Sequence, residues 1–231
     1  SDKEIIEYKR YLDRRSKHEP IAYILEEKEF WSKKFKVNKN TLIPRPETEL
    51  MVEKIVKIFE KKRIYILDIG TGTGCILLSL LSELKTSKGI GIDISKKAIE
   101  IAQSNSKKHG LNHRTKFFRR SLSEIYQNKF DLIVSNPPYI RKKDIKNLNE
   151  DIKKFEPKLA LDGGNDGLDV IKKVIYKSKD ILKIKGMLAL EIGNEQFKKV
   201  SNILRSNKFK TKYLVKDYRE NIRCILSILE K

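Results

Sequence analysis

From residue 63 onward, short apolar segments alternate with longer segments in which apolar residues recur at helical spacing. The strand-like segments are Ile64–Ile69, Gly89–Ile94, Lys116–Arg119, Phe130–Ser135 and Met187–Ile192. The helix-like segments are Cys75–Leu84, residues 96–109, residues 166–183 and Glu195–Ser206. Such alternation predicts an α/β fold, a doubly wound and mostly parallel sheet flanked by helices. Thr211–Val215 and Ile222–Leu229 are expected to close the sheet as an antiparallel pair.

The residues before this region predict a smaller appendage. Residues 1–18 are expected to form a helix, because their apolar side chains fall on one face. Ile21–Phe30 and Phe35–Ile43 predict a β-hairpin whose turn covers the four residues between them. A helix with an apolar stripe is expected to follow Pro46.

Length and composition exclude several classes of protein. A chain of 231 residues, 39% of them hydrophobic, can bury the core of one α/β domain with a small appendage. No apolar segment is long enough to span a membrane. The two cysteines, Cys75 and Cys224, form no CxxC pair and indicate a reducing, cytoplasmic location. The three histidines lie outside the motifs below, which argues against a histidine-based metal site or catalytic triad.

A glycine-rich loop follows the first predicted strand and opens a helix, and Asp93 ends the next strand. Glycines let the backbone approach a ligand, the helix start offers free N–H groups, and an acid at Asp93 can accept both hydroxyls of a ribose. The spacing is G-x-G-x-G, with an acid two residues before the first glycine. This spacing looks like that of loops that bind S-adenosylmethionine, and it differs from the loops that bind nicotinamide cofactors and from Walker loops. The expected cofactor-binding residues are Asp68, Gly70, Thr71, Gly72, Thr73, Gly74 and Asp93.

Two features of this loop leave alternatives open. A glycine-rich segment also forms plain tight turns, although the strand before it, the helix after it and Asp93 favour a binding site. Cys75 stands at the helix start, where a thiol pKa is often lowered. The alternative is that Cys75 is a small packing residue.

The motif Asn136-Pro137-Pro138-Tyr139 directly follows the predicted strand Phe130–Ser135. It therefore lies at a strand's carboxyl end, where open α/β sheets bind ligands. Asn136 supplies a side-chain carbonyl, the prolines stiffen the loop and donate no N–H, and Tyr139 adds a ring for stacking. These groups suit the planar NH2 group of an amide or a nucleobase. A rigid turn is the alternative.

A methyl donor beside a pocket for a planar NH2 group indicates an N-methyltransferase. The lone pair of such a nitrogen is delocalised, so the protein must mainly align it with the methyl group, which contributes roughly 7–11 kcal/mol in favourable cases. We expect Asn136 Oδ1 and the Pro137 carbonyl oxygen to hold the NH2 group. No carboxylate pair and no Ser–His or Cys–His arrangement indicates a competing chemistry.

Five segments give the chain a resemblance to a known family: Glu19–Ile24, Leu42–Glu49, Asp68–Gly74, Asn136–Ile140 and Glu156–Gly167. With them the chain resembles the HemK/PrmC family, the protein-glutamine N5-methyltransferases that modify class-1 peptide release factors. Asn-Pro-Pro-Tyr is shared with DNA adenine and RNA guanine methyltransferases. The second and fifth segments are far more specific to the family.

The resemblance implies a Rossmann-like, seven-stranded S-adenosylmethionine-dependent methyltransferase sheet preceded by a small helical domain. Residues 1–18 would be the remnant of that domain, because the chain begins at Ser1 without a methionine. Residues 19–45 would form a β-hairpin linker and residues 46–231 the methyltransferase domain. The implied substrate is the glutamine of the Gly-Gly-Gln tip of a class-1 release factor.

The resemblance also assigns site residues. Those implied to hold the glutamine amide and to form the catalytic loop are Asn136, Pro137, Pro138 and Tyr139. Those implied to border the substrate pocket are Pro44, Arg45, Pro46 and Glu47, although Pro46 and the acids after it also suit a plain helix start. Further cofactor contacts are expected at Ile94, Asn136 and, for the adenine, Ser121 or Leu122.

The chain departs from the family pattern in two places. Glu26 and Ser32 stand where the family usually has glycine, so the hairpin turns are expected to differ. An acidic residue commonly follows the third strand of the sheet in this family, whereas this chain has Arg119-Arg120-Ser121-Leu122 there.

The formal net charge of +20 favours anionic partners such as RNA or the ribosome. Basic doublets along predicted helices are equally typical of solvated helix faces, so a nucleic-acid contact stays open. Two other functions therefore compete with the release-factor interpretation. One is methylation of an exocyclic amine of a nucleobase in RNA or DNA. The other is a non-catalytic RNA- or ribosome-binding module. No contact with a membrane is expected.

Overall fold

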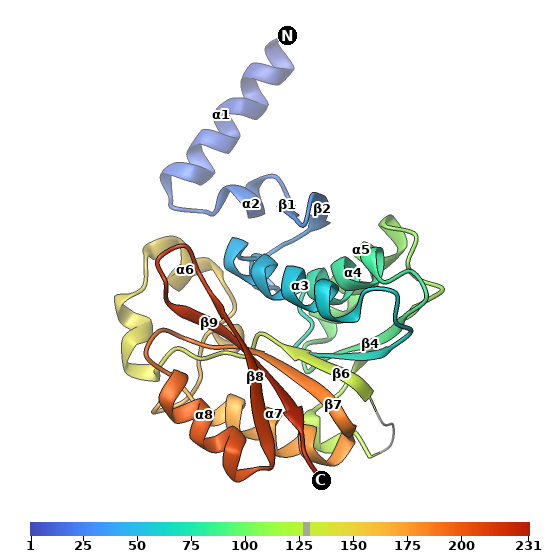
Figure 1. Ribbon diagram of the computed structural model, residues 1–231. Coiled ribbons are helices and arrows are strands. Elements are labelled where there is room, and N and C mark those ends of the chain that lie inside the picture. The colour runs from blue at the N-terminus through green and yellow to red at the C-terminus, as the bar shows by residue number, and fades with distance from the viewer. Residues whose placement is uncertain (127–129) are drawn as a thin grey trace.

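The computed structural model describes residues 1–126 and 130–231, and its centre is a single large sheet (Figure 1). The strands are β3 (Tyr65–Ile69), β4 (Lys88–Asp93), β5 (Thr115–Arg119), β6 (Phe130–Ser135), β7 (Leu182–Glu191), β8 (Phe209–Lys216) and β9 (Ile222–Leu229). They are ordered β5-β4-β3-β6-β7-β9-β8. The first five strands in this order pair in parallel, and β9 is antiparallel to both β7 and β8. The predicted seven-stranded, mostly parallel sheet is confirmed.

Helices cover both faces of the sheet. They are α3 (Pro46–Phe59), α4 (Cys75–Glu83), α5 (Lys96–Lys108), α7 (Asp169–Ile181) and α8 (Phe197–Ser206). Side chains alternate between the two faces along a strand, so the neighbours Ile66 and Leu67 belong to different cores. Ile66 packs in the core beneath α3, α4 and α5, and Leu67 packs in the core beneath α7 and α8. Ser95 caps the start of α5, since its hydroxyl accepts from Ala98 N at 3.2 Å.

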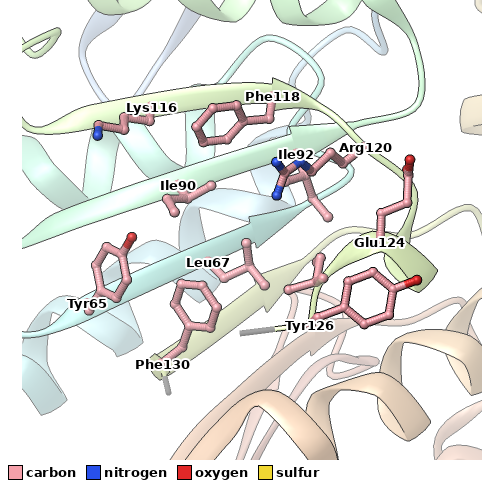
Figure 2. A pocket seen from close by; sticks show the side chains of 11 residues that line it. Tyr65, Leu67, Ile90, Ile92, Lys116, Phe118, Arg120, Glu124, Tyr126 and Phe130 are labelled. Carbon is pink, nitrogen blue, oxygen red and sulfur yellow. The ribbon is translucent and has the colours of Figure 1, made fainter. Parts of the chain in front are cut away.

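One part of the sheet has no long helix over it. The described residues between β5 and β6 include only a short 3-10 helix, η1 (Leu122–Glu124). A cavity of about 440 Å³ lies there, against the face of β3, β4 and β5 that carries Leu67 (Figure 2). Its lining is mostly aromatic and aliphatic: Tyr65, Leu67, Ile90, Ile92, Lys116, Phe118, Arg120, Glu124, Ile125, Tyr126 and Phe130.

The N-terminal elements are α1 (Asp2–Ser16), α2 (Ile21–Ile24), β1 (Glu27–Phe30) and β2 (Lys33–Lys36). The helix predicted for residues 1–18 is confirmed. It points away from the sheet and buries none of its residues (Figure 1). The proposed division of the chain after residues 18 and 45 stays a prediction.

The predicted hairpin was too long at both outer ends. Ile21–Ile24 is a helical turn, which lets Tyr23 pack in a small core with Val37 and Ile43. Only four residues of each strand pair, from Glu27 opposite Lys36 inward. The continuous apolar run of residues 21–25 favoured a strand, whereas in the structure residues 21–24 form a helical turn that buries Tyr23 and Ile24.

The hairpin uses left-handed residues where the family usually has glycine. Glu26 has a φ of 53°, and Trp31 and Ser32 at the tip have φ values of 51° and 52°. Two consecutive residues with positive φ form the tight turn that matches the twist of the strands. The turn conformation is therefore kept with non-glycine residues, at a cost of roughly 1–2 kcal/mol per residue.

The chain between β6 and α7 contains elements that were not predicted: η2 (Lys142–Asn147), α6 (Glu150–Phe155) and η3 (Lys158–Ala160). Strand β7 begins at Leu182, five residues before the predicted start. The first half of the strand was not predicted because it is polar, with Lys183 and Lys185. None of the described helices is both long and apolar enough to cross a membrane.

Candidate active site

A cavity of about 400 Å³ lies where β3, β4 and β6 end, and residues after all three strands line it. Several members come from the two predicted motifs: Gly70, Thr71, Gly72, Thr73, Asp93, Ile94, Asn136 and Pro138. Others come from the chain before α3 and from the segment after α6: Lys39, Asn40, Thr41, Leu42, Pro44, Arg45, Pro157, Leu159, Ala160 and Asp162. The structure thus brings the glycine-rich loop and the Asn-Pro-Pro-Tyr loop to one cavity.

The glycine-rich loop is folded back on the sheet by its own backbone. The N–H groups of Gly70 and Thr71 both donate to the Ile92 carbonyl at 2.9 Å. Gly72 then takes a φ of 54°, which a side chain would strain, and its N–H donates to Asp93 Oδ2 at 3.1 Å. The loop is therefore held between β3 and β4 with its outer surface on the cavity.

Asp68 is the buried acid behind this loop. The Thr71 hydroxyl donates to Asp68 Oδ2 at 2.7 Å, while Oδ1 has no hydrogen-bond partner among the described residues. Burial raises the pKa of Asp68 to about 7. Buried polar atoms are nearly always paired, so the unpaired Oδ1 suits a cationic or N–H donor, although Asp68 is fully buried behind the loop and is not among the residues that line the cavity.

Asp93 is positioned by backbone donors on both of its oxygens. Oδ2 accepts from Gly72 N at 3.1 Å, and Oδ1 accepts from Ser95 N at 2.9 Å. Burial raises the pKa of Asp93, and these backbone hydrogen bonds oppose the rise. Each carboxylate oxygen has a further lone pair, so Asp93 can still accept the hydroxyls of a ribose.

Asn105 connects the cofactor loop to the N-terminal hairpin. Its side chain is fully buried on α5, and Nδ2 donates to the carbonyls of Thr73 at 2.9 Å and Lys36 at 3.0 Å. Its Oδ1 accepts from Lys36 N at 2.7 Å. One side chain thus fixes strand β2 against the glycine-rich loop. Pattern analysis offered no signal for Asn105, which lies in the middle of a predicted helix.

Asn136 lies at the end of β6, on the wall of the cavity. The preceding residue, Ser135, is buried and donates its hydroxyl to the Ile69 carbonyl at 2.7 Å. This bond fastens the end of β6 to the end of β3. Because Ile69 leads into the glycine-rich loop, the two motifs keep a fixed separation.

The segment after the Asn-Pro-Pro-Tyr loop is fastened to the chain that follows α6. Ile140 N donates to the Leu161 carbonyl at 3.1 Å, and Gly163 N donates to the Ile140 carbonyl at 2.8 Å. A Cβ atom on Gly163 would lie 2.8 Å from Tyr139 Cα and 2.9 Å from the Pro138 carbonyl oxygen. The loop therefore depends on a glycine at residue 163.

Tyr139 and Pro137 do not line the cavity in this structure. The ring of Tyr139 packs against the core beneath α7 and α8, where burial raises the pKa of its hydroxyl to about 12. Its carbonyl accepts from Gln196 Nε2 at 3.0 Å. Here Tyr139 anchors the loop, whereas sequence reasoning gave it a stacking role.

Arg45, which lines the cavity, forms a partly buried ion pair with Glu156, which does not line it. The guanidinium Nη2 lies 2.5 Å from Glu156 Oε1, and the backbone N–H of Ile43 donates to Oε2 at 3.3 Å. The Glu156 side chain is 1% exposed. Burial raises the pKa of Glu156, and Arg45 opposes the rise. This pair joins the two segments that carried the more specific resemblance.

Three comparisons with known proteins agree. The family model described as Methyltransferase small domain matches residues 46–164. The release factor glutamine methyltransferase of Haemophilus influenzae is 40% identical over 95% of this chain and 79% of its own length. That of Buchnera aphidicola is 41% identical over 92% of this chain and 76% of its own length.

The chain belongs to the release factor glutamine methyltransferase family. It carries a methyltransferase domain. Its fold is that of S-adenosylmethionine-dependent methyltransferases. A SAM dependent methyltransferase from Aquifex aeolicus superposes with a TM-score of 0.56 at 17% identity, over 80% of this chain and 94% of that one.

Several assigned residues lie apart from the cavity of this methyltransferase domain. Pro46 and Glu47 are exposed at the start of α3, as the plain helix-start alternative describes. Leu122 lines the cavity, whereas the Ser121 hydroxyl is hydrogen-bonded to Glu124 Oε2 at 2.9 Å. Gly74 is the N-cap residue of α4 and does not line the cavity. Arg120, which was given no role, lines both cavities together with Ile92.

The lowered pKa that a helix start could give Cys75 is not found. Its sulfur is buried in the core under α3 and α4, and burial raises its pKa to about 12. Desolvation has the largest effect on this pKa, and the hydrogen bond with the Thr73 side chain opposes it only in part. Cys75 is the packing residue that the alternative described.

Sequence reasoning missed two buried residues next to Asn136. Thr48 on α3 donates its hydroxyl to Glu191 Oε2 at 2.6 Å, and Asn136 Nδ2 donates to Thr48 Oγ1 at 3.4 Å. Glu191 is 2% exposed at the carboxyl end of β7. An acid that ends a buried strand next to β6 was the available signal.

Glu191→Gln is expected to gain stability relative to the wild type as the pH rises from about 5 to about 8. Burial raises the pKa of Glu191 to about 7, so the folded state binds this proton more tightly than the unfolded state. The stability from this protonation is present at low pH and lost as the pH passes 7, whereas glutamine does not titrate. The difference in unfolding free energy should change by about 3 kcal/mol. Urea unfolding at three pH values checks it, and a constant difference would contradict it.

Proposed function

We propose that this chain methylates the side-chain amide nitrogen of the glutamine in the Gly-Gly-Gln motif of class-1 release factors, with S-adenosylmethionine as methyl donor. The observation that carries the proposal is the shared cavity, which residues 70–73 of the glycine-rich loop and Asn136 both line. Named relatives at about 40% identity support the same substrate. The proposed location is the cytoplasm, where release factors act.

The glycine-rich side of the cavity supports the choice of cofactor. The free Asp68 Oδ1 suits the ammonium of the methionine part, and the loop backbone suits its carboxylate. Asp93 suits the ribose, and Ile94 and Leu122 line the cavity where the adenine is proposed to lie. When bound, the cofactor supplies an electrophilic methyl group on a sulfonium.

The other side of the cavity supports an amide substrate. Asn136 Oδ1 and the Pro137 carbonyl can accept the two N–H groups of the glutamine NH2, and neither proline donates an N–H in competition. The held nitrogen forms its new N–C bond as the S–C bond breaks, and one N–H proton is released to solvent. The residues mainly align the nitrogen, which contributes roughly 7–11 kcal/mol in favourable cases.

The rim of the cavity is the proposed contact for the release factor. Pro44 and Arg45 line it from the segment before α3, and Arg45 is held there by Glu156. Exposed Leu159 lines the cavity from the opposite segment. We propose that Pro44, Arg45 and the neighbouring Pro46 and Glu47 border the entering Gly-Gly-Gln loop.

The test is transfer of labelled methyl from S-adenosylmethionine to an unmodified class-1 release factor, with bulk RNA and DNA assayed in parallel. We expect label on the release factor and none on a release factor whose Gly-Gly-Gln glutamine is replaced by alanine. Label on nucleic acid alone would overturn the proposal in favour of a nucleobase N-methyltransferase. Salt-sensitive RNA binding without any transfer would favour the non-catalytic module.

Asp68→Asn is expected to weaken binding of S-adenosylmethionine by about tenfold or more. The substitution keeps the shape of the side chain but removes the charge that would pair with the ammonium, and charge-assisted hydrogen bonds are about twice as strong as neutral ones. Isothermal titration of the wild type and the variant measures the change. Asp166→Asn, in the loop before α7, is the matched control, and equal affinities for Asp68→Asn and wild type would contradict the assignment.

A further inference from the structure

Thr48 lies between two polar groups that come from distant parts of the chain. Its Oγ1 is 2.6 Å from Glu191 Oε2 on β7 and 3.4 Å from Asn136 Nδ2 at the end of β6. Thr48 and Glu191 are each 2% exposed, so water does not compete for these contacts. Glu191 is not part of the cavity lining, whereas Thr48 and Asn136 are.

The chemistry of the three groups allows one direction of donation. An ionised carboxylate only accepts hydrogen bonds, and a threonine hydroxyl has a single proton to donate. Because Thr48 donates that proton to Glu191, its oxygen is left as an acceptor for Asn136. Only the NH2 end of the Asn136 amide can fill that place, so the Asn136 oxygen is left at the other end.

We propose that Glu191, acting through Thr48, orients the side-chain amide of Asn136 so that its oxygen is available to the cavity. The proposal rests on the proposed function, since an acceptor at this place is what a substrate NH2 group requires. In the opposite orientation, the NH2 group of Asn136 would face the NH2 group of the substrate, and neither would have an acceptor. Glu191 and Thr48 are thus positioning residues.

The protonation state of Glu191 decides whether this arrangement holds. The charged and titratable groups that act on it are Glu47 on α3, Cys75 on α4, Tyr139 after β6, and Arg223 and Cys224 on β9. Burial raises the pKa of Glu191 to about 7, while the Thr48 hydroxyl, Arg223 and Asn136 oppose the rise. A protonated Glu191 can donate its proton to the Thr48 oxygen. The Thr48 hydroxyl can then donate to the Asn136 oxygen, so the Asn136 amide no longer prefers one orientation.

The first test compares two substitutions of Thr48 in the methyl-transfer assay. Thr48→Val removes the hydroxyl at nearly the same size, and we expect kcat to fall between about tenfold and a hundredfold, with the affinity for S-adenosylmethionine unchanged. Thr48→Ser keeps the hydroxyl and should restore kcat to within about threefold of the wild type. Thermal unfolding of both variants shows whether they are folded. Equal kcat values for the valine and serine variants would overturn the proposal.

The second test follows kcat against pH at saturating cofactor, which keeps the titration of Asp68 out of the measurement. The wild type should lose activity as the pH falls through the titration of Glu191. Glu191→Gln should remove that dependence. A wild-type profile and a Glu191→Gln profile of the same shape would overturn the proposal.

The third measurement does not depend on the reaction. The side-chain NH2 resonances of Asn136, assigned by their loss in Asn136→Ala, should shift in Thr48→Val and stay in place in Thr48→Ser. If the wild type transfers no methyl group to a release factor, the proposed function fails, and these resonances still decide the orientation. Unshifted Asn136 resonances in Thr48→Val would overturn the proposal whatever the substrate is.

Discussion

Replacing Asn136 by alanine is expected to lower kcat for methyl transfer to a release factor by about 10²–10³-fold, the usual effect of removing one preorganised polar group from a reacting centre. Asn136 lies on the wall of the cavity and presents the acceptor for the glutamine NH2 group. Without it, the nitrogen loses both its orientation and a partner that polarises it. Single-turnover transfer of labelled methyl, at saturating cofactor and release factor, measures the effect.

Two controls make this result specific. Asn136→Ala should weaken binding of S-adenosylmethionine less than Asp68→Asn does, because the residues proposed to bind the methionine and ribose parts lie on and after β3 and β4 and Asn136 is one expected contact among several. Asn202→Ala, an exposed asparagine on α8, should keep full activity. An Asn136→Ala enzyme with wild-type kcat would show that Asn136 does not hold the reacting amide.

Gly163→Ala is expected to lower kcat by about 10²-fold, although residue 163 is not in the cavity lining. The added methyl group would lie 2.8 Å from Tyr139 Cα, 2.8 Å from the Gly167 carbonyl oxygen and 2.9 Å from the Pro138 carbonyl oxygen. All three are backbone atoms, so the loop itself must move. A displacement near 1 Å at a reacting group costs about 10²-fold in rate.

Loss of stability alone must be separated from this effect. Overpacking of this kind costs about 1–3 kcal/mol, so Gly163→Ala should also unfold at lower temperature. Gly110→Ala, with a φ of 67° and no atom within 4 Å of the added Cβ, should lose stability through backbone strain while keeping its kcat. If kcat of Gly163→Ala matches that of Gly110→Ala, the Asn-Pro-Pro-Tyr loop does not depend on this contact.

Local patterns predicted the parts of the site that are local in the chain. The loop from Asp68 to Gly74 and the motif at Asn136 follow strands directly, and strand ends in a parallel sheet meet at one edge. Both motifs line the same cavity for that reason. The helical turn at Ile21–Ile24 was missed because burial of Tyr23 overrode the local pattern, and the start of β7 was missed because Lys183 and Lys185 there are polar and exposed.

Contacts between distant residues could not be predicted from one sequence. Thr48 and Glu191 are 143 residues apart, and Arg45 and Glu156 are 111 residues apart. Thr48 looked like an ordinary residue of a first helical turn, and Glu191 like the polar end of a strand. Their roles depend on α3 crossing the sheet over the end of β7, which no periodicity in either segment records.

The hydrogen bonds of Asn105 have a thermodynamic consequence for binding, because they couple the cofactor loop to the N-terminal hairpin. The Asn105 amide is bonded to Thr73 in the cofactor loop and to Lys36 in the hairpin at the same time. A cofactor that immobilises the Thr73 backbone should therefore slow hydrogen exchange in β1 and β2, which it does not touch. Linkage is reciprocal. If the cofactor raises the affinity of the hairpin for a partner, the bound partner must raise the affinity for the cofactor by the same factor.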